Sequence, residues 1–260
     1  MNMQISGVNM HYEITGSGEK RVVLLHGWGC STKLMQPVAD HLSKDMTVML
    51  VDFPAHGESG RPPEPWGVPE FAACLLELLR KTDFLPCSVI AHSFGGRVTI
   101  ELASADASLF ERIILTGAAG IKPPATGKAS KRTRTYKRLK ACAELLRKTR
   151  IFAGLAERWQ EALVQKYGSK DYAALDPKMR QTFVKVVNYD QSEKLAKIAS
   201  STLLVWGDGD TETPLWMGQR MEREIPDSAL IVLEGGTHFA YLEHIGRFNA
   251  IAHSFLVESN

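Results

Sequence analysis

Short runs of uninterrupted apolar residues constrain this chain more than any other feature of its sequence. In a strand with one solvated face, apolar and polar residues alternate, whereas these runs are apolar at nearly every position. Strands of that kind are buried on both faces, which is typical of parallel sheets covered by helices. The runs lie at residues 21–25, 47–52, 87–91, 113–116, 202–206 and 229–233.

Helical segments separate these runs. Helices are expected at residues 32–44, 71–80 and 248–257, and a partly alternating strand is expected at residues 4–14. Proline and glycine crowd into residues 53–67, which predicts a long loop. Strands that alternate with helices predict an α/β fold with a mostly parallel central sheet flanked by helices.

The composition changes after Gly120. Basic residues crowd together just beyond it, and the pattern stays helical, with no run typical of a buried strand. We therefore expect residues 1–120 and 191–260 to form the core and residues 121–190 to form a helical cap inserted into it. A chain of 260 residues is long enough to bury one large core.

The overall composition argues against several classes of protein. A formal net charge of +2 gives no argument for nucleic-acid binding, and no apolar segment is long enough to span a bilayer. The N-terminal residues lack the basic stretch and apolar run of a signal peptide, so we expect a cytoplasmic location. The cysteines show no CxxC pair, so neither a zinc site nor a disulfide framework is expected. They are Cys30, Cys74, Cys87 and Cys142.

The segment AHSFGG, residues 91–96, places Ser93 at the bend between an expected strand and a helical pattern. Small residues two positions either side of this serine let the strand and the helix approach closely, as a tight turn requires. A serine hydroxyl is a poor nucleophile at neutral pH. It therefore needs a histidine to accept its proton, an acid to orient the histidine, and hydrogen-bond donors for the oxyanion.

Loops that follow expected strands supply these groups. One late apolar run leads into Asp208 and Asp210, and the next leads into His238. Because open α/β sheets build their sites at the carboxyl ends of the strands, these side chains are expected at one edge of the sheet. The backbone N–H groups of Phe94, which starts a helix, and of Trp28, in an early strand-end loop, are the expected oxyanion donors.

Five ordered segments complete this pattern. They are HGWG at 26–29, DFPAHGES at 52–59, AHSFGG at 91–96, WGDGDTETP at 206–214 and GGTHFAYLE at 235–243. Together they resemble the α/β-hydrolase fold family of the esterase and lipase type, which carries a helical cap. In that resemblance they match, in order, the oxyanion loop, a DxPGHGxS loop, the nucleophile elbow, the acid loop and the histidine loop. Only the insertion stays unassigned.

The resemblance implies an α/β-hydrolase fold and a carboxylic ester hydrolase that needs no metal or organic cofactor. The family's GxxD spacing selects Asp210 as the acid, so Asp208 is expected to hold or cap its loop. His238 would take the proton of Ser93, and the two backbone donors would receive the oxyanion as an acyl-enzyme forms.

Aromatic residues beside these groups are expected to line the substrate pocket: Trp28, Phe94 and Phe239. They favour an apolar acyl or alcohol group, and the alternative is that they belong to the core. A cap that covers the site would exclude water and favour small or medium substrates. Ala91 and Ala55 depart from the family by standing where it usually has glycine, but neither change removes a reacting group.

The other histidines are expected to have structural roles. His26, His56 and His92 fall inside the motifs and are expected to hold loops through hydrogen bonds. Surface or helix positions are expected for the remainder, which are His11, His41, His244 and His253.

Several questions stay open at this point. The same triad serves carbon–carbon bond hydrolases and cofactor-free perhydrolases, and the fold also acts as a ligand receptor with its triad intact. Ser93 argues against the family's dehalogenases and epoxide hydrolases, which use an aspartate nucleophile.

Residues 128–140 carry seven basic side chains and no acid. They predict either a solvated helix face or a patch that attracts an anionic substrate or acidic carrier, as in the pimeloyl-carrier-protein methyl esterases that the chain resembles. No nucleic-acid or membrane partner is expected.

Overall fold

A central sheet organises the computed structural model, which describes residues 1–122, 138, 158–159, 161–162 and 170–257. Within these residues the sheet has eight strands in the order β1-β2-β4-β3-β5-β6-β7-β8. The strands β1 and β2 pair antiparallel, as do β2 and β4, and every other pair is parallel. The strands are β1 (Asn2–Ile5), β2 (Val8–Thr15), β3 (Arg21–Leu25), β4 (Thr47–Val51), β5 (Cys87–His92), β6 (Phe110–Thr116), β7 (Ser201–Gly207) and β8 (Ser228–Leu233). The predicted α/β fold with a mostly parallel sheet is confirmed.

The N-terminal segment differs from its prediction. The single strand expected at 4–14 is a hairpin of β1 and β2, with Ile5 opposite Val8. Ser6 and Gly7 make the turn with φ angles of 48° and 78°. Two-residue hairpin turns of this type need positive φ at both central residues, which glycine adopts freely and serine does not.

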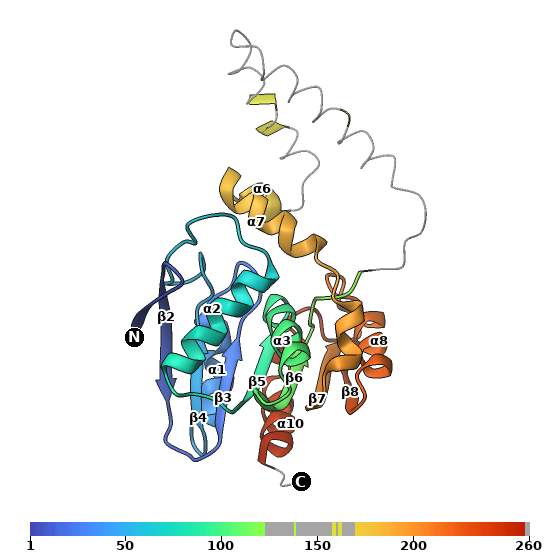
Figure 1. Ribbon diagram of the computed structural model, residues 1–260. Helices are drawn as coiled ribbons and strands as arrows, with labels where there is room; N and C mark the ends of the chain where they lie inside the picture. The colour runs from blue at the N-terminus through green and yellow to red at the C-terminus, as the bar shows by residue number, and fades with distance from the viewer. Residues whose placement is uncertain (123–137, 139–157, 160, 163–169, 258–260) are drawn as a thin grey trace. The chain divides into compact units, whose positions relative to one another are not determined.

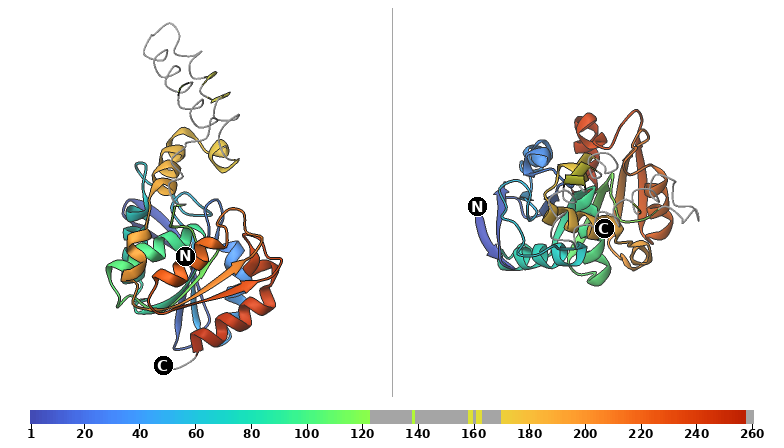
Figure 2. Two further views of the ribbon diagram at one scale, coloured as in Figure 1. Left: turned by 90° about the vertical axis from the view of Figure 1, so that its right-hand side faces the viewer. Right: turned by 90° about the horizontal axis from the view of Figure 1, so that it is seen from above.

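Helices cover both faces of the sheet (Figures 1 and 2). The helices α1 (Thr32–Leu42), α9 (Ala240–Glu243) and α10 (Ile245–Val257) pack on one face, where Leu24, Leu50 and Phe248 are fully or almost fully buried. The other face carries α2 (Val68–Lys81), α3 (Phe94–Ala105), the 3-10 helix η1 (Ser192–Lys197) and α8 (Trp216–Glu224). Two apolar clusters therefore exclude water from both sides of the parallel strands, as their continuous apolar runs require.

The chain divides into two compact units. Met1–Ile121 and Lys185–Asn260 form one, and Lys122–Val184 form the other. The second unit includes α6 (Lys170–Ala174) and most of α7 (Pro177–Asn188), and within it the Arg180 guanidinium pairs with the Glu161 carboxylate at 2.6 and 2.9 Å.

The two residues that flank the expected insertion, Gly120 and Gln191, are hydrogen-bonded to each other within the first unit. The Gln191 backbone N–H donates to the Gly120 carbonyl at 2.8 Å, and its side-chain amide donates to the Arg97 carbonyl in α3 at 2.9 Å. The predicted basic segment 128–140 lies outside the described residues except for Arg138. The extent of the cap, residues 121–190, and its role stay predictions. No helix among the described residues has both the length and the apolarity needed to cross a bilayer.

Candidate active site

The bend after β5 holds Ser93 in a strained backbone conformation. Its φ and ψ angles are 50° and −107°, which a residue other than glycine adopts only where its surroundings enforce them. Ser93 is half-buried, whereas its neighbours His92 and Phe94 are 1% and 2% exposed. A Cβ atom on Gly95 would lie 2.7 Å from the Leu25 carbonyl oxygen, so this glycine lets α3 start directly against β3. The bend thus leaves its serine more accessible than either neighbour.

The loop after β7 holds Asp210 against His238. Asp210 Oδ2 lies 2.9 Å from His238 Nδ1 and 2.7 Å from Thr213 Oγ1. Asp210 Oδ1 accepts hydrogen bonds from the backbone N–H groups of Glu212 and Thr213, both at 2.9 Å. Burial raises the pKa of the Asp210 carboxyl, but the hydrogen bonds from His238 and Thr213 outweigh burial and hold that pKa below its ordinary value. Asp210 is therefore a buried, ionised partner for the histidine.

The neighbouring Asp208 has a different place. Its exposed carboxylate accepts a hydrogen bond from the Gly235 backbone N–H at 2.7 Å, which ties the loop after β7 to the loop after β8. Glu243 fixes the latter loop as well, because its carboxylate accepts hydrogen bonds from the backbone N–H and the hydroxyl of Thr237 at 2.7 and 2.5 Å. Sequence reasoning did not single out Thr213 or Glu243. The sequence feature that could have indicated them is a short separation from a polar loop residue: Thr213 lies three residues after Asp210, and Glu243 lies six residues after Thr237.

His92 joins the serine bend to the histidine loop. Its Nε2–H donates to the His238 carbonyl oxygen at 2.9 Å, and the two imidazole centroids lie 4.7 Å apart. Burial lowers the pKa of His92 to about 3, so the ring is neutral. Its Nδ1 has no hydrogen-bond partner among the described residues. A Cβ atom on Gly27 would lie 2.8 Å from that nitrogen, so this glycine allows the loop after β3 to lie against the ring.

His26 fixes the loop that carries Trp28. Its Nδ1–H donates to the Gly27 carbonyl at 2.7 Å, and its Nε2 accepts from the Phe53 backbone N–H at 3.1 Å. This pair of contacts defines a neutral ring, and burial lowers the pKa of His26 to about 4. The His26 carbonyl also accepts from the Gly95 backbone N–H at 3.2 Å, which connects this loop to the serine bend.

The two expected oxyanion donors lie on these connected segments. Among the described residues, the Phe94 backbone N–H has no acceptor, and it stands at the start of α3, where the helix dipole favours negative charge. The Trp28 and Phe94 rings meet edge to face with centroids 5.3 Å apart. The arrangement brings the two residues together at one end of β3 and β5.

The three expected pocket residues have different surroundings. The Phe94 ring is almost fully buried and packs against Phe53 and Phe71, at centroid distances of 5.0 Å in both cases. Trp28 is half-buried at the margin of that aromatic cluster, whereas the half-buried Phe239 contacts the imidazole rings of His92 and His238. Phe94 thus has a structural role in the core, and the pocket role of all three stays a prediction.

The expectation for His11 was wrong. His11 lies on β2 and is 7% exposed, with Nδ1 3.0 Å from Asp52 Oδ2. The same carboxylate accepts hydrogen bonds from the backbone N–H groups of Thr32 and Glu58, at 2.8 and 2.9 Å. The antiparallel pairing of β2 with β4 brings His11 to the end of β4, and no local pattern in the sequence encodes that pairing. No group of three histidine, cysteine or acidic side chains within the described part of the chain is arranged to hold a metal ion.

Comparison with curated proteins finds similar chains among hydrolases. The chain is 27% identical over 259 residues to a pimeloyl-[acyl-carrier protein] methyl ester esterase of Neisseria meningitidis, an alignment that covers 91% of this chain and 77% of that protein. It is 24% identical over 265 residues to a 2-hydroxy-6-oxononadienedioate/2-hydroxy-6-oxononatrienedioate hydrolase of Cupriavidus pinatubonensis, covering 95% of this chain and 90% of that one.

Solved structures share the fold. An esterase from Exiguobacterium antarcticum superposes with a TM-score of 0.76 at 21% identity, and the match covers 99% of each chain. The model of the Alpha/beta hydrolase family matches residues 22–251, which include all five motifs. The chain is a hydrolase and belongs to the alpha/beta hydrolase family.

Proposed function

We propose that this hydrolase cleaves carboxylic esters of small or medium-sized substrates through an acyl-enzyme on Ser93. The observation that carries the proposal is the 2.9 Å contact between Asp210 Oδ2 and His238 Nδ1, on a loop that His92 ties to the serine bend. An ionised Asp210 favours the proton on Nδ1, so the lone pair of His238 lies on Nε2. That nitrogen is the proposed base for the serine hydroxyl.

In the proposed acylation, Ser93 Oγ attacks the ester carbonyl carbon while His238 Nε2 takes the hydroxyl proton. The oxyanion is received by the backbone N–H groups of Trp28 and Phe94. His238 then gives its proton to the departing alcohol oxygen. Water, deprotonated by His238, releases the acid and restores the serine hydroxyl, so each step balances without a metal or organic cofactor.

The relatives support this proposal and one alternative. The similar Neisseria protein is named as a methyl ester esterase, which favours ester cleavage. The similar Cupriavidus protein is named as a hydrolase of an oxo-dienedioate, which makes carbon–carbon bond hydrolysis the second candidate. If the basic segment 128–140 attracts an acidic carrier or an anionic substrate, turnover of such a substrate falls steeply with added salt.

Hydrolysis of 4-nitrophenyl esters of increasing acyl length tests the proposal. We expect the wild type to release nitrophenol with an optimum chain length, and Ser93→Ala to lower kcat by at least about 10³-fold. Ser88→Ala is the matched control, since it removes a buried hydroxyl from β5, the strand that leads into Ser93, and is expected to retain activity. Equal activity of Ser93→Ala and the wild type would contradict the proposal. Inactivity of both on every ester, with cleavage of a vinylogous diketone, would favour the second candidate.

A further inference from the structure

A second carboxylate lies beside His238, on the ring nitrogen opposite Asp210. Glu212 Oε2 is 3.5 Å from His238 Nε2, whereas Asp210 Oδ2 is 2.9 Å from Nδ1. The Asp210 side chain is completely buried, but the Glu212 side chain is 64% exposed. The two acids therefore differ in role, because only Glu212 presents its charge to solvent beside the nitrogen that faces the reactants.

The backbone at Glu212 is fixed by the same carboxylate that orients the histidine. Asp210 Oδ1 accepts the Glu212 backbone N–H at 2.9 Å, and Asp210 Oδ2 contacts His238 Nδ1. Trp206 Nε1–H also donates to the Thr213 carbonyl at 2.7 Å, which anchors the following residue. Buried contacts thus fix the backbone that carries Glu212 next to the loop of His238.

This inference rests on the proposed ester hydrolysis. His238 Nε2 gives its proton to the departing alcohol oxygen, so that oxygen must come within about 3 Å of it. The alcohol oxygen then lies no more than about 6.5 Å from Glu212 Oε2. A unit charge carried close to that oxygen feels the Glu212 carboxylate within one Debye length.

We propose that Glu212 selects the charge of the alcohol part of the substrate. It favours esters whose alcohol carries an ammonium group and disfavours those whose alcohol carries a carboxylate. Because Glu212 is exposed, solvent screens the interaction, and we expect an effect of about fivefold in kcat/KM rather than of several orders of magnitude.

A pair of substrates with the same shape and different charge tests this inference. The probes are the choline ester and the uncharged 3,3-dimethylbutyl ester of whichever acyl group gives the fastest nitrophenyl ester. The measured quantity is the ratio of their kcat/KM values, which normalises each variant to its own activity. In the wild type we expect a ratio above one that falls with added salt, and in Glu212→Gln a ratio about fivefold lower.

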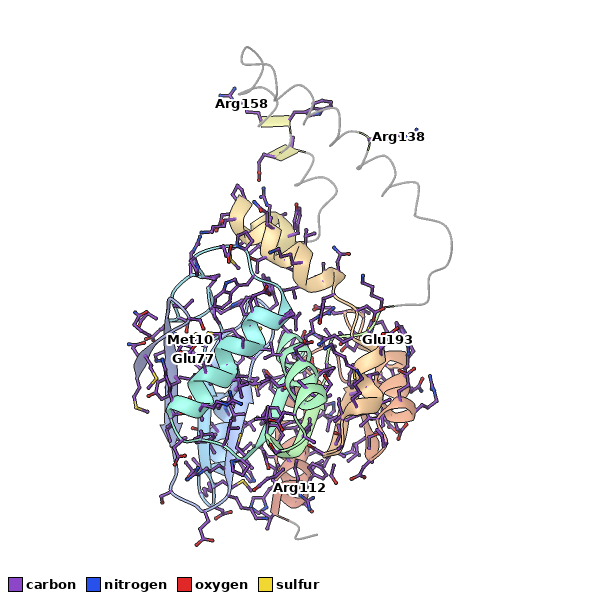
Figure 3. The ribbon with its side chains drawn as sticks, in the orientation of Figure 1. Met10, Glu77, Arg112, Arg138, Arg158 and Glu193 are labelled. Atoms are coloured by element: carbon purple, nitrogen blue, oxygen red, sulfur yellow. The ribbon has the colours of Figure 1, made fainter. Side chains whose placement is uncertain are left out.

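The control for this test is Glu111→Gln. Glu111 is exposed at the start of β6, next to Arg112, which lies at the end of the sheet away from the strands' carboxyl ends (Figure 3). The Glu111→Gln substitution removes the same charge as Glu212→Gln does, and we expect the ratio of the two kcat/KM values to stay at the wild-type value.

An ester of glycolate, whose alcohol carries a carboxylate, should change in the opposite sense and become a better substrate in Glu212→Gln.

The outcomes separate this inference from the proposed function. If the wild type hydrolyses both esters and the ratio is the same in the wild type and Glu212→Gln, charge selection by Glu212 is wrong while ester hydrolysis stands. If the wild type hydrolyses neither the nitrophenyl series nor these esters, the proposed function and the inference built on it are both overturned.

Discussion

Two buried aspartate–histidine pairs in this protein have nearly the same local chemistry. Asp52 Oδ2 lies 3.0 Å from His11 Nδ1, and Asp210 Oδ2 lies 2.9 Å from His238 Nδ1. Each aspartate follows a strand of the sheet, and each accepts two backbone N–H groups as well. Burial, an anionic partner and an oriented imidazole are thus present twice.

Both pairs also have a carboxylate near the second ring nitrogen: Glu58 lies 3.6 Å from His11 Nε2, and Glu212 lies 3.5 Å from His238 Nε2. The pairs differ in the backbone contact of the histidine. The His11 carbonyl accepts from the Asp52 backbone N–H at 3.1 Å, whereas the His238 carbonyl accepts from the ring of His92, the residue that precedes Ser93. An aspartate–histidine pair is therefore a way to hold loops together, and we infer that the neighbouring serine bend is what makes one of the two reactive.

Parallel substitutions of the two histidines give the largest expected contrast. His238→Gln removes the proposed base, and we expect kcat for the best nitrophenyl ester to fall by at least about 10³-fold. His11→Gln should retain that activity, and because it loses a hydrogen bond to a buried carboxylate, it should unfold with a free energy lower by about 1–3 kcal/mol. Steady-state kinetics and urea denaturation measure the two effects. The contrast breaks down if His11→Gln loses activity while it remains folded.

A smaller expected effect is the change of stability with pH that comes from the neutral histidines around the serine bend. Burial lowers the pKa values of His26 and His92 to about 4 and about 3, from 6.5. Below pH 6.5 the unfolded chain binds protons that the folded chain does not, so the stability from these residues is full above pH 6.5 and is lost as the pH falls toward 4. The expected slope is about 1.4 kcal/mol per pH unit for each histidine.

The variant His92→Gln sharpens that prediction. Glutamine does not titrate, and its amide N–H is able to replace the donor to the His238 carbonyl. We expect urea denaturation between pH 4.5 and 6.5 to show a shallower fall of stability with acid than in the wild type, by the contribution of one histidine. An unchanged slope would mean that His92 is not a buried neutral ring in the folded protein.

Local patterns in the sequence predicted much of the fold. Continuous apolar runs predicted the parallel strands because burial on both faces leaves no polar position, and β5 is buried along its whole length. The GxxD spacing of the family that the chain resembles selected Asp210 over Asp208. In the structure Asp210 contacts His238, whereas Asp208 accepts a hydrogen bond from the Gly235 backbone. The parallel topology brings the ends of β5, β7 and β8, which lead into Ser93, Asp210 and His238, to one edge of the sheet.

Long-range pairing was not predictable in the same way. The pair of His11 and Asp52 depends on antiparallel pairing of β2 with β4, and these residues are separated by 41 positions. Glu212 was overlooked for another reason: an exposed glutamate in a polar loop has no signal until the fold places His238 beside it. Hairpin formation at Ser6 and Gly7 was missed because serine is rarely found at positive φ.

Covalent labelling tests the central claim, that Ser93 is the nucleophile, most directly. A fluorophosphonate is attacked by an activated serine oxygen, which forms an oxygen–phosphorus bond and expels fluoride. We expect intact-mass and peptide mass spectrometry to find one adduct per wild-type chain, on the peptide that contains Ser93, and none on Ser93→Ala. Labelling of a different residue, or ester hydrolysis by a wild-type enzyme that forms no adduct on Ser93, would contradict the account.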